Sequence, residues 1–361
     1  MSVCDKNLIV FFGLLTLIIC GMGYSSPVFG QHSAQERQPT HPLAQAQTVL
    51  IEGIALTERG LQNPEPLIQT VTKRLHKAGW TVVPQTDQPH DAVVRIKYEE
   101  RQTWTGPSQH RRTGPAPTTR LWKGPACHLT YRFNHQSPNW SWEVRTSFEG
   151  TREAAKATGA TDSGAFALNE LNAQLQHDDF PLYLAAEWEQ TDRLLAIYRE
   201  SSDQIERQRT ILHLLGGLPS DQALTTLEEA LSHPTLASTA LLALGQQGEA
   251  GIPVLVSFLH SSTDPDQQLA AIQGLGTIAA QNKTPILFTQ FMTLLESGDP
   301  RIQTEAVKGL GNLGDRRAVQ SLEQLNLKVW TDSSTSPDMQ ALRDMLSWSL
   351  WELNPTAHTG G

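Results

Sequence analysis

The sequence predicts an α+β module followed by an all-α repeat array, with a targeting segment in front. Three observations support this fold class. Apolar and polar side chains alternate in several runs of residues 48–148, one helical pattern recurs through residues 201–325, and residues 8–20 form an uncharged apolar run. Alternation with a period of two is typical of strands that bury one face. A pattern that recurs about every 30 residues is typical of stacked helical hairpins.

Residues 1–30 are predicted to be an export signal. The apolar run Leu8–Cys20 has 13 residues, fewer than the roughly 20 that a membrane-spanning helix needs. We expect cleavage after Gly30. Two alternatives stay open: lipid attachment at Cys20, although Ile19 stands where a lipobox has a small residue, or an uncleaved anchor. All three interpretations place the rest of the chain outside the cytoplasm, in the periplasm or the extracellular space.

Residues 31–47 are predicted to be a linker, because they are rich in Gln, His, Pro and Ala and show no apolar periodicity. Cleavage of the leader removes Cys4 and Cys20 and leaves only Cys127. No disulfide can then form within the chain, and we expect the Cys127 thiol to be a small buried apolar group in a strand.

Residues 48–180 are predicted to form the α+β domain, in the order β-α-β-β-β-α. A β-branched apolar run at residues 48–56 predicts the first strand, and a short second strand is expected at residues 81–83. Between them, four apolar residues recur at helical spacing before Gly79 ends the helix: Leu67, Ile68, Val71 and Leu75.

The second half of this domain is predicted to be a three-strand meander and a helix. Apolar and polar residues alternate over residues 92–103, 126–133 and 140–148, and a helix is expected from about Ser163 to Gln176. This order predicts one sheet that two helices cover on one side.

The loop at residues 104–121 is a candidate anion-binding site. It contains Arg111, Arg112 and Arg120, and residues 92–156 hold 11 Lys and Arg against 5 Asp and Glu. Loops of this length in compact domains are usually functional or disordered. One interpretation is a site for a phosphate, an anionic lipid or glycan, or an acidic protein surface, and the other is a solvated loop that maintains solubility.

The carboxyl-terminal half contains the strongest pattern in the chain. Asp299-Pro300 precedes Ala306 and Gly311 at offsets that recur in two earlier copies, and a fourth copy lacks only the Asp-Pro start. The glycines of the four copies are Gly216, Gly245, Gly276 and Gly311, which are spaced by 29, 31 and 35 residues. Proline is tolerated in the first turn of a helix, and small residues allow helices to cross closely.

These residues resemble the HEAT-like repeats first described in phycobilisome lyases. The resemblance covers about residues 201–325, and we assign residues 181–354 to this domain, with capping helices at residues 182–198 and 339–353. Ala279–Asn282 replaces the usual Gly-Asp turn, so that hairpin is expected to be longer or irregular. Trp348 and Trp351 of the last helix are expected to face the core.

The resemblance implies a concave surface that binds protein partners through its inner helices. From their helix positions, five residues are candidates for partner contacts: Gln268, Gln273, Gln303, Glu305 and Lys308.

The sequence carries no motif for catalysis, a cofactor or a metal. It has no GxSxG, HExxH, P-loop, GxGxxG, CxxC or EF-hand pattern. A net charge of −9 and a pI near 5.7 exclude a generally basic nucleic-acid-binding protein. We therefore expect an exported, non-enzymatic protein-binding scaffold or adaptor in the bacterial cell envelope, without a cofactor. The alternatives are an envelope-assembly lipoprotein and, as the family resemblance implies, an accessory factor for cofactor or chromophore attachment.

Overall fold

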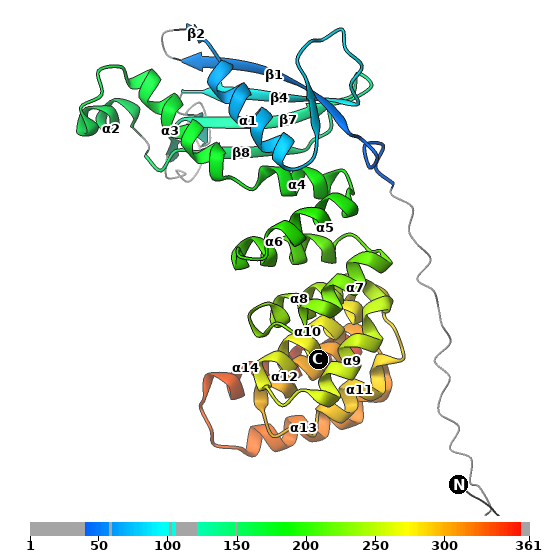
Figure 1. Cartoon of the computed structure of the whole chain (residues 1–361). Coiled ribbons are helices and arrows are strands. Elements are labelled where there is room, and N and C mark those ends of the chain that lie inside the picture. Colours follow the sequence, from blue (N-terminus) through cyan, green and yellow to red (C-terminus); the bar gives the residue numbers. More distant parts are fainter. Residues whose placement is uncertain (1–39, 58–59, 101–102, 106–120, 149, 355–361) are drawn as a thin grey trace, which may run out of the picture. The chain divides into compact units, whose positions relative to one another are not determined.

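Figure 1 shows the computed structural model, which describes residues 40–57, 60–100, 103–105, 121–148 and 150–354. Within these residues an α+β module comes first and a run of helices follows, which confirms the predicted fold class. The predicted export signal lies outside the described residues. None of the helices in the described ranges is long and apolar enough to cross a membrane.

The module is built on a mixed sheet with the strand order β2-β1-β4-β7-β8, and β3 also pairs with β1. β1 lies parallel to β3 and β4, whereas β4, β7 and β8 form an antiparallel meander, as predicted. Strand β2 was not indicated by the sequence pattern. The strands are β1 Thr48–Thr57, β2 Gly60–Gln62, β3 Thr81–Val83, β4 Ala92–Glu99, β7 Ala126–Arg132 and β8 Ser141–Arg145.

Two helices cover one face of this sheet, as predicted (Figure 1). They are α1 (Glu65–Lys77) and α3 (Ser163–His177), and a short helix that the sequence did not indicate, α2 (Thr151–Thr158), precedes α3. Asp162 begins α3 by accepting hydrogen bonds from two backbone N–H groups of the first turn. The buried stripe of the two helices consists of Leu67, Val71, Leu75, Ala167, Leu171 and Leu175.

A second, two-stranded sheet lies in the predicted long loop. β5 (Thr103–Thr105) pairs antiparallel with β6 (Leu121–Lys123). The residues between these strands, including Arg111, Arg112 and Arg120, lie outside the described residues. The anion-binding site that we expect there stays a prediction.

The helical half begins with α4 (Phe180–Glu187) and α5 (Thr191–Glu200) and then forms two layers. Helices α6, α8, α10, α12 and α14 pack side by side in what we call the close-packed layer, and α7, α9, α11 and α13 form the second layer. The bounds are α6 Ile205–Gly216, α7 Asp221–Ala230, α8 Pro234–Gln246, α9 Ile252–Ser261, α10 Pro265–Asn282, α11 Leu287–Leu294, α12 Pro300–Leu313, α13 Val319–Thr331 and α14 Pro337–Leu353.

The helix starts and stops that the repeat pattern predicts are present. Asp264 and Asp299 each cap a helix, since a side-chain oxygen accepts a backbone N–H of the first turn at 3.0 and 2.8 Å. Gly314 ends α12 with φ of 69°. The irregular copy is longer, as predicted, because α10 continues to Asn282, and Lys283 is its C-cap residue.

Small residues let the close-packed layer form. A Cβ atom added to Gly245 of α8 would lie 2.6 Å from the backbone of Gly274 in α10. At Gly311 of α12, an added Cβ would lie 2.7 Å from the hydroxyl of Ser349 in α14. Gly245 and Gly311 are therefore contact points between consecutive helices, whereas a Cβ added to Gly276 would meet no atom within 4 Å. A larger side chain at Gly245 would meet backbone.

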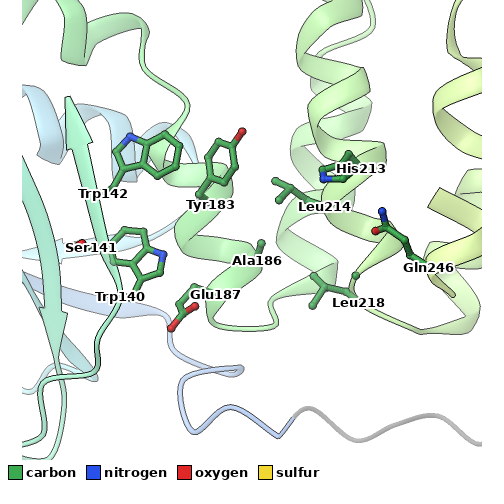
Figure 2. A pocket seen from close by; sticks show the side chains of 11 residues that line it. Trp140, Ser141, Trp142, Tyr183, Ala186, Glu187, His213, Leu214, Leu218 and Gln246 are labelled. Carbon is green, nitrogen blue, oxygen red and sulfur yellow. The ribbon is translucent and has the colours of Figure 1, made fainter. Parts of the chain in front are cut away.

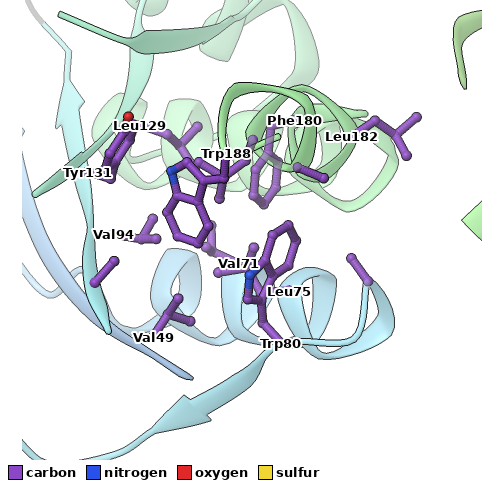
Figure 3. Close-up of a cluster of buried hydrophobic side chains, with 14 of the residues drawn as sticks. Val49, Val71, Leu75, Trp80, Val94, Leu129, Tyr131, Phe180, Leu182 and Trp188 are labelled. Carbon is purple, nitrogen blue, oxygen red and sulfur yellow. The ribbon is translucent and has the colours of Figure 1, made fainter. Parts of the chain in front are cut away.

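The hydrophobic core of the module continues into the first helices of the array (Figure 3). Trp188, which follows α4, is fully buried, and its ring packs edge-on against Trp80 at 5.7 Å and against Tyr131 at 5.4 Å. Residues of α4, α5 and α6 belong to the same buried cluster as the strands. The predicted domain boundary at residue 180 therefore falls inside a continuous core.

The structure also differs from the predicted linker over its last residues. Leu43 and Ala46 are 4% exposed, and Gln190 donates its side-chain N–H groups to their carbonyl oxygens at 2.9 and 2.8 Å. Arg193 lies over the ring of Trp80 at 4.0 Å and donates to the carbonyl of Ala46 at 3.4 Å. Residues 40–47 are thus packed on the core, which composition alone did not indicate.

Candidate protein-binding surface

Charged and amide side chains connect neighbouring helices across the close-packed layer. Arg301 of α12 donates to Asp266 of α10 at 2.9 Å, and Gln273 of α10 donates to Glu305 of α12 at 3.2 Å. Lys308 lies one turn further along α12, with its Nζ 3.5 Å from Glu305. Spacings of three, four and seven residues keep these side chains on one face of each helix. We call Asp266, Gln273, Arg301, Glu305 and Lys308 the polar row.

The structure brings three predicted contact residues together in this row. Gln273, Glu305 and Lys308 lie within one hydrogen-bonded group, with Lys308 47% exposed and Glu305 16% exposed. The sequence argument missed Arg301 and Asp266, although both stand at helix starts whose spacing repeats. The ends of the row reach the surface, since the side chains of Asp266 and Arg301 are 79% and 39% exposed.

The other two predicted residues serve the array itself. Gln268 donates to the carbonyl of Ser262 at 2.7 Å, across the start of α10. Gln303 is 9% exposed and donates to the carbonyl of Leu295 at 2.8 Å, so the prediction that it contacts a partner is wrong. Gln303 precedes the buried Leu310 by seven residues, and this spacing could have placed it on the buried stripe.

The aromatic residues of the last helix are more exposed than predicted. Trp348 is 38% exposed and Trp351 is 52% exposed. The buried stripe of α14 runs instead through Leu342, Leu346 and Ser349. The expectation that both tryptophans face the core is therefore wrong, because a helix at the end of an array has no further repeat to cover its outer side.

A cleft of about 500 Å³ lies beside β8, between the sheet and the first helices of the array (Figure 2). Its sheet side is formed by Trp140, Ser141 and Trp142, and the ring of Trp142 stacks on Tyr183 of α4 at 4.2 Å. The remaining lining residues come from α4, α6, α8 and the turn after α6: Ala186, Glu187, His213, Leu214, Gly217, Leu218 and Gln246.

A chain of hydrogen bonds leads from the packed amino-terminal segment to this cleft. The N–H of Leu43 donates to Nδ1 of His41 at 3.2 Å, so the neutral ring carries its proton on Nε2. That nitrogen lies 3.0 Å from the hydroxyl of Tyr131, which donates to Glu187 at 2.9 Å. Burial lowers the pKa of His41, against the opposing effect of Glu187 and Glu189.

A second carboxylate, Asp178, supports the aromatic wall of the cleft. It accepts the indole N–H of Trp142 at 2.8 Å and the backbone N–H of Phe180 at 2.7 Å. Burial raises the pKa of Asp178, although both hydrogen bonds favour its charged form. Trp142 is therefore held from two sides, by this hydrogen bond and by the stacked Tyr183.

The described ranges contain no cluster of His, Cys, Asp and Glu that could hold a metal ion. Cys127 lies fully buried in β7, as predicted for a small apolar strand residue. The chemistry that these residues offer is recognition through hydrogen bonds, charge and apolar contact.

A family model of HEAT repeats matches residues 191–276 and, in a second overlapping segment, residues 252–330. Residues 191–330 form a HEAT-repeat solenoid. These matches confirm the repeat prediction and extend it upstream to α5. The polar row lies within the matched HEAT repeats, whereas the sheet and α14 lie outside them.

Among solved structures, the chain is similar to an engineered protein described as Northeast Structural Genomics Consortium target OR329, with 18% sequence identity and a TM-score of 0.35. The similarity covers 57% of this chain and 96% of that chain. A comparison with curated proteins finds no match. HEAT repeats are often protein-interaction surfaces.

Proposed function

We propose that this chain is an exported, non-enzymatic scaffold or adaptor of the bacterial cell envelope that binds a protein through the polar row of its HEAT repeats. The polar row carries the proposal, because charged and amide groups line up there across α10 and α12. An array of this kind distributes affinity over many side chains instead of one pocket.

The partner-binding role is tested by capture from a native envelope fraction. The bait is the full chain, and the row variant combines Gln273→Ala with Lys308→Glu. Its matched control combines Gln324→Ala with Lys328→Glu, since these residues are exposed on α13 of the second layer. We expect the row variant to recover at least tenfold less partner than the wild type does. The control variant should recover as much partner as the wild type. Equal recovery by both variants would remove the polar row from the proposal.

The export part of the proposal rests on the apolar leader of residues 8–20. Sequencing the mature amino terminus from envelope fractions, together with metabolic labelling by a fatty acid, tests it. A mature chain that begins at Gln31 supports cleavage after Gly30, and label on Cys20 supports the lipoprotein alternative. Full-length chain recovered only from the cytoplasm contradicts export.

The accessory-factor alternative makes a different prediction. A chain that assists cofactor or chromophore attachment should carry a small chromophore or cofactor when purified from its native host. Mass spectrometry and absorption spectra of the purified chain would show it. A bound small molecule, with no protein recovered by capture, would replace the scaffold proposal.

A further inference from the structure

One edge of the sheet is open beside the cleft. β8 is the last strand in the order, and within the part of the chain that the structure describes it pairs only with β7. Among the described residues, no backbone hydrogen bond other than those to β7 involves Ser141–Arg145. An open edge offers unpaired N–H and C=O groups that can pair with another extended chain.

The side chains of this edge are divided between two environments. Trp142 pairs with Leu129 and Val144 pairs with Cys127, so Trp142 and Val144 lie on the buried, helix-covered side of the sheet. The charged residues of β8, Glu143 and Arg145, lie on the opposite side and bond to each other. The cleft beside the open edge is therefore lined by aromatic side chains and not by the strand's charges (Figure 2).

The cleft holds polar groups whose hydrogen-bonding capacity is not filled by the described residues. Glu187 accepts one hydrogen bond, from Tyr131, and makes no ion pair within that part of the chain. Among the same residues, the indole N–H of Trp140 and the amide of Gln246 make no hydrogen bond. The neighbouring surface is apolar, with Ala186 and Leu214 between these groups. A carboxylate in such surroundings attracts a cation.

We propose that β8 and the adjoining cleft bind an extended peptide segment of a partner protein, which adds to the sheet as a strand and places a Lys or Arg side chain against Glu187. This goes beyond the proposed function, because it adds a second binding site on the sheet that is separate from the polar row. β8 has five residues, so the added strand would span about 17 Å. Every second side chain of the peptide enters the cleft. The volume of the cleft, about 500 Å³, suits a small number of apolar or basic side chains.

The geometry favours a peptide over a saccharide. Sugars bind through the exposed flat faces of aromatic rings, but Trp142 already stacks on Tyr183 with an angle of 24° between their planes. The unpaired strand edge, in contrast, matches the backbone of a peptide and has no counterpart in a sugar.

The test starts from peptides that are selected for the cleft. A phage library of random heptapeptides is selected on the purified full chain, after removal of phage that bind the Ala186→Trp variant, whose indole fills the cleft. We expect the selected peptides to alternate apolar residues with at least one Lys or Arg. Synthetic copies should bind wild type at least tenfold more tightly than Ala186→Trp in calorimetric titrations.

Two further measurements examine the backbone and the charge separately. In one set of peptides, every second backbone nitrogen, on the edge that would pair with β8, carries a methyl group. These amides can no longer donate to the strand, so binding should weaken at least tenfold. Glu187→Gln keeps an acceptor for Tyr131 and removes the charge, so it should weaken binding of Lys-containing peptides about three- to thirtyfold. Glu296→Gln, an exposed carboxylate on the α11–α12 turn, is the matched control and should leave binding unchanged.

Four results would each overturn the proposal. The first is that no selected peptide distinguishes wild type from Ala186→Trp, and the second is that binding tolerates the methylated backbone. The third is displacement of the peptide by a tetramer of N-acetylglucosamine, and the fourth is unchanged affinity in Glu187→Gln. The Gln273→Ala, Lys308→Glu variant should bind the peptide normally. Failure of the polar row in capture experiments is therefore distinguishable from failure at β8.

Discussion

Replacing Gly245 by Ala should destabilise the HEAT solenoid, although alanine is the better helix former. The exchange gains about 1 kcal/mol of helix propensity within α8. The new Cβ, however, would lie 2.6 Å from the backbone of Gly274, and α8 and α10 must separate by roughly 0.8 Å to reach ordinary contact. Because the obstacle is backbone, no side-chain rotation relieves it. Overpacking of this kind costs about 1–3 kcal/mol, so the net loss of stability is up to about 2 kcal/mol.

Gly276→Ala is the matched control, in the neighbouring helix α10. A Cβ added there meets no atom within 4 Å, so the propensity gain of about 1 kcal/mol should appear as added stability. Urea titrations followed by circular dichroism, together with thermal melts, measure both variants. For a unit of this size we expect a shift of about 2–4 °C per kcal/mol, downward for Gly245→Ala and upward for Gly276→Ala. Equal stabilisation by both exchanges would refute the close approach of α8 and α10.

Three other predictions concern the packed amino-terminal segment and the core. Gln190→Ala should cost about 1–3 kcal/mol, because the buried carbonyl of Leu43 loses its side-chain donor and that of Ala46 keeps only the 3.4 Å bond from Arg193. Limited proteolysis should then cut the segment sooner. Burial lowers the pKa of His41, so the folded state favours the neutral ring. The contribution of His41 to folding stability is therefore complete above the ordinary pKa of 6.5 and is lost as pH falls through the lower folded value. His41→Gln should reduce the drop in the urea unfolding midpoint between pH 7.5 and 5. Burial raises the pKa of Cys127 to about 12, so iodoacetamide at pH 8 should label it only after unfolding, and rapid labelling of the native chain would contradict its burial.

The sequence was sufficient for features that depend on local chemistry. Asp264 and Asp299 identify helix starts, because a carboxylate followed by Pro satisfies free N–H groups and fits the first turn. The absence of a Gly-Asp turn after Ile278 predicted the longer α10, which ends at Lys283. Alternation likewise placed the strands of the meander, since a strand with one buried face repeats every two residues.

Features that depend on contacts between distant residues could not be predicted. Residues 40–47 have the composition of a linker, and only the distant Gln190 and Arg193 satisfy their carbonyl groups. Gln303 looks like a surface residue by type, yet it donates to the carbonyl of Leu295 inside a hairpin. The cleft itself joins Trp142 with residues of three helices, and no sequence spacing relates them.

The continuous core has a consequence for recognition. Trp188, at the end of α4, packs against Trp80 and Tyr131, and loss of such a buried tryptophan costs about 3–5 kcal/mol. Helix α4 therefore cannot move away from the sheet without opening the core, and its cleft residues Ala186 and Glu187 are held in place by folding. A preformed wall of this kind lowers the ordering cost of binding. Helices α10 and α12, which carry the polar row, pack in a separate hydrophobic cluster, so the two proposed sites do not share a core.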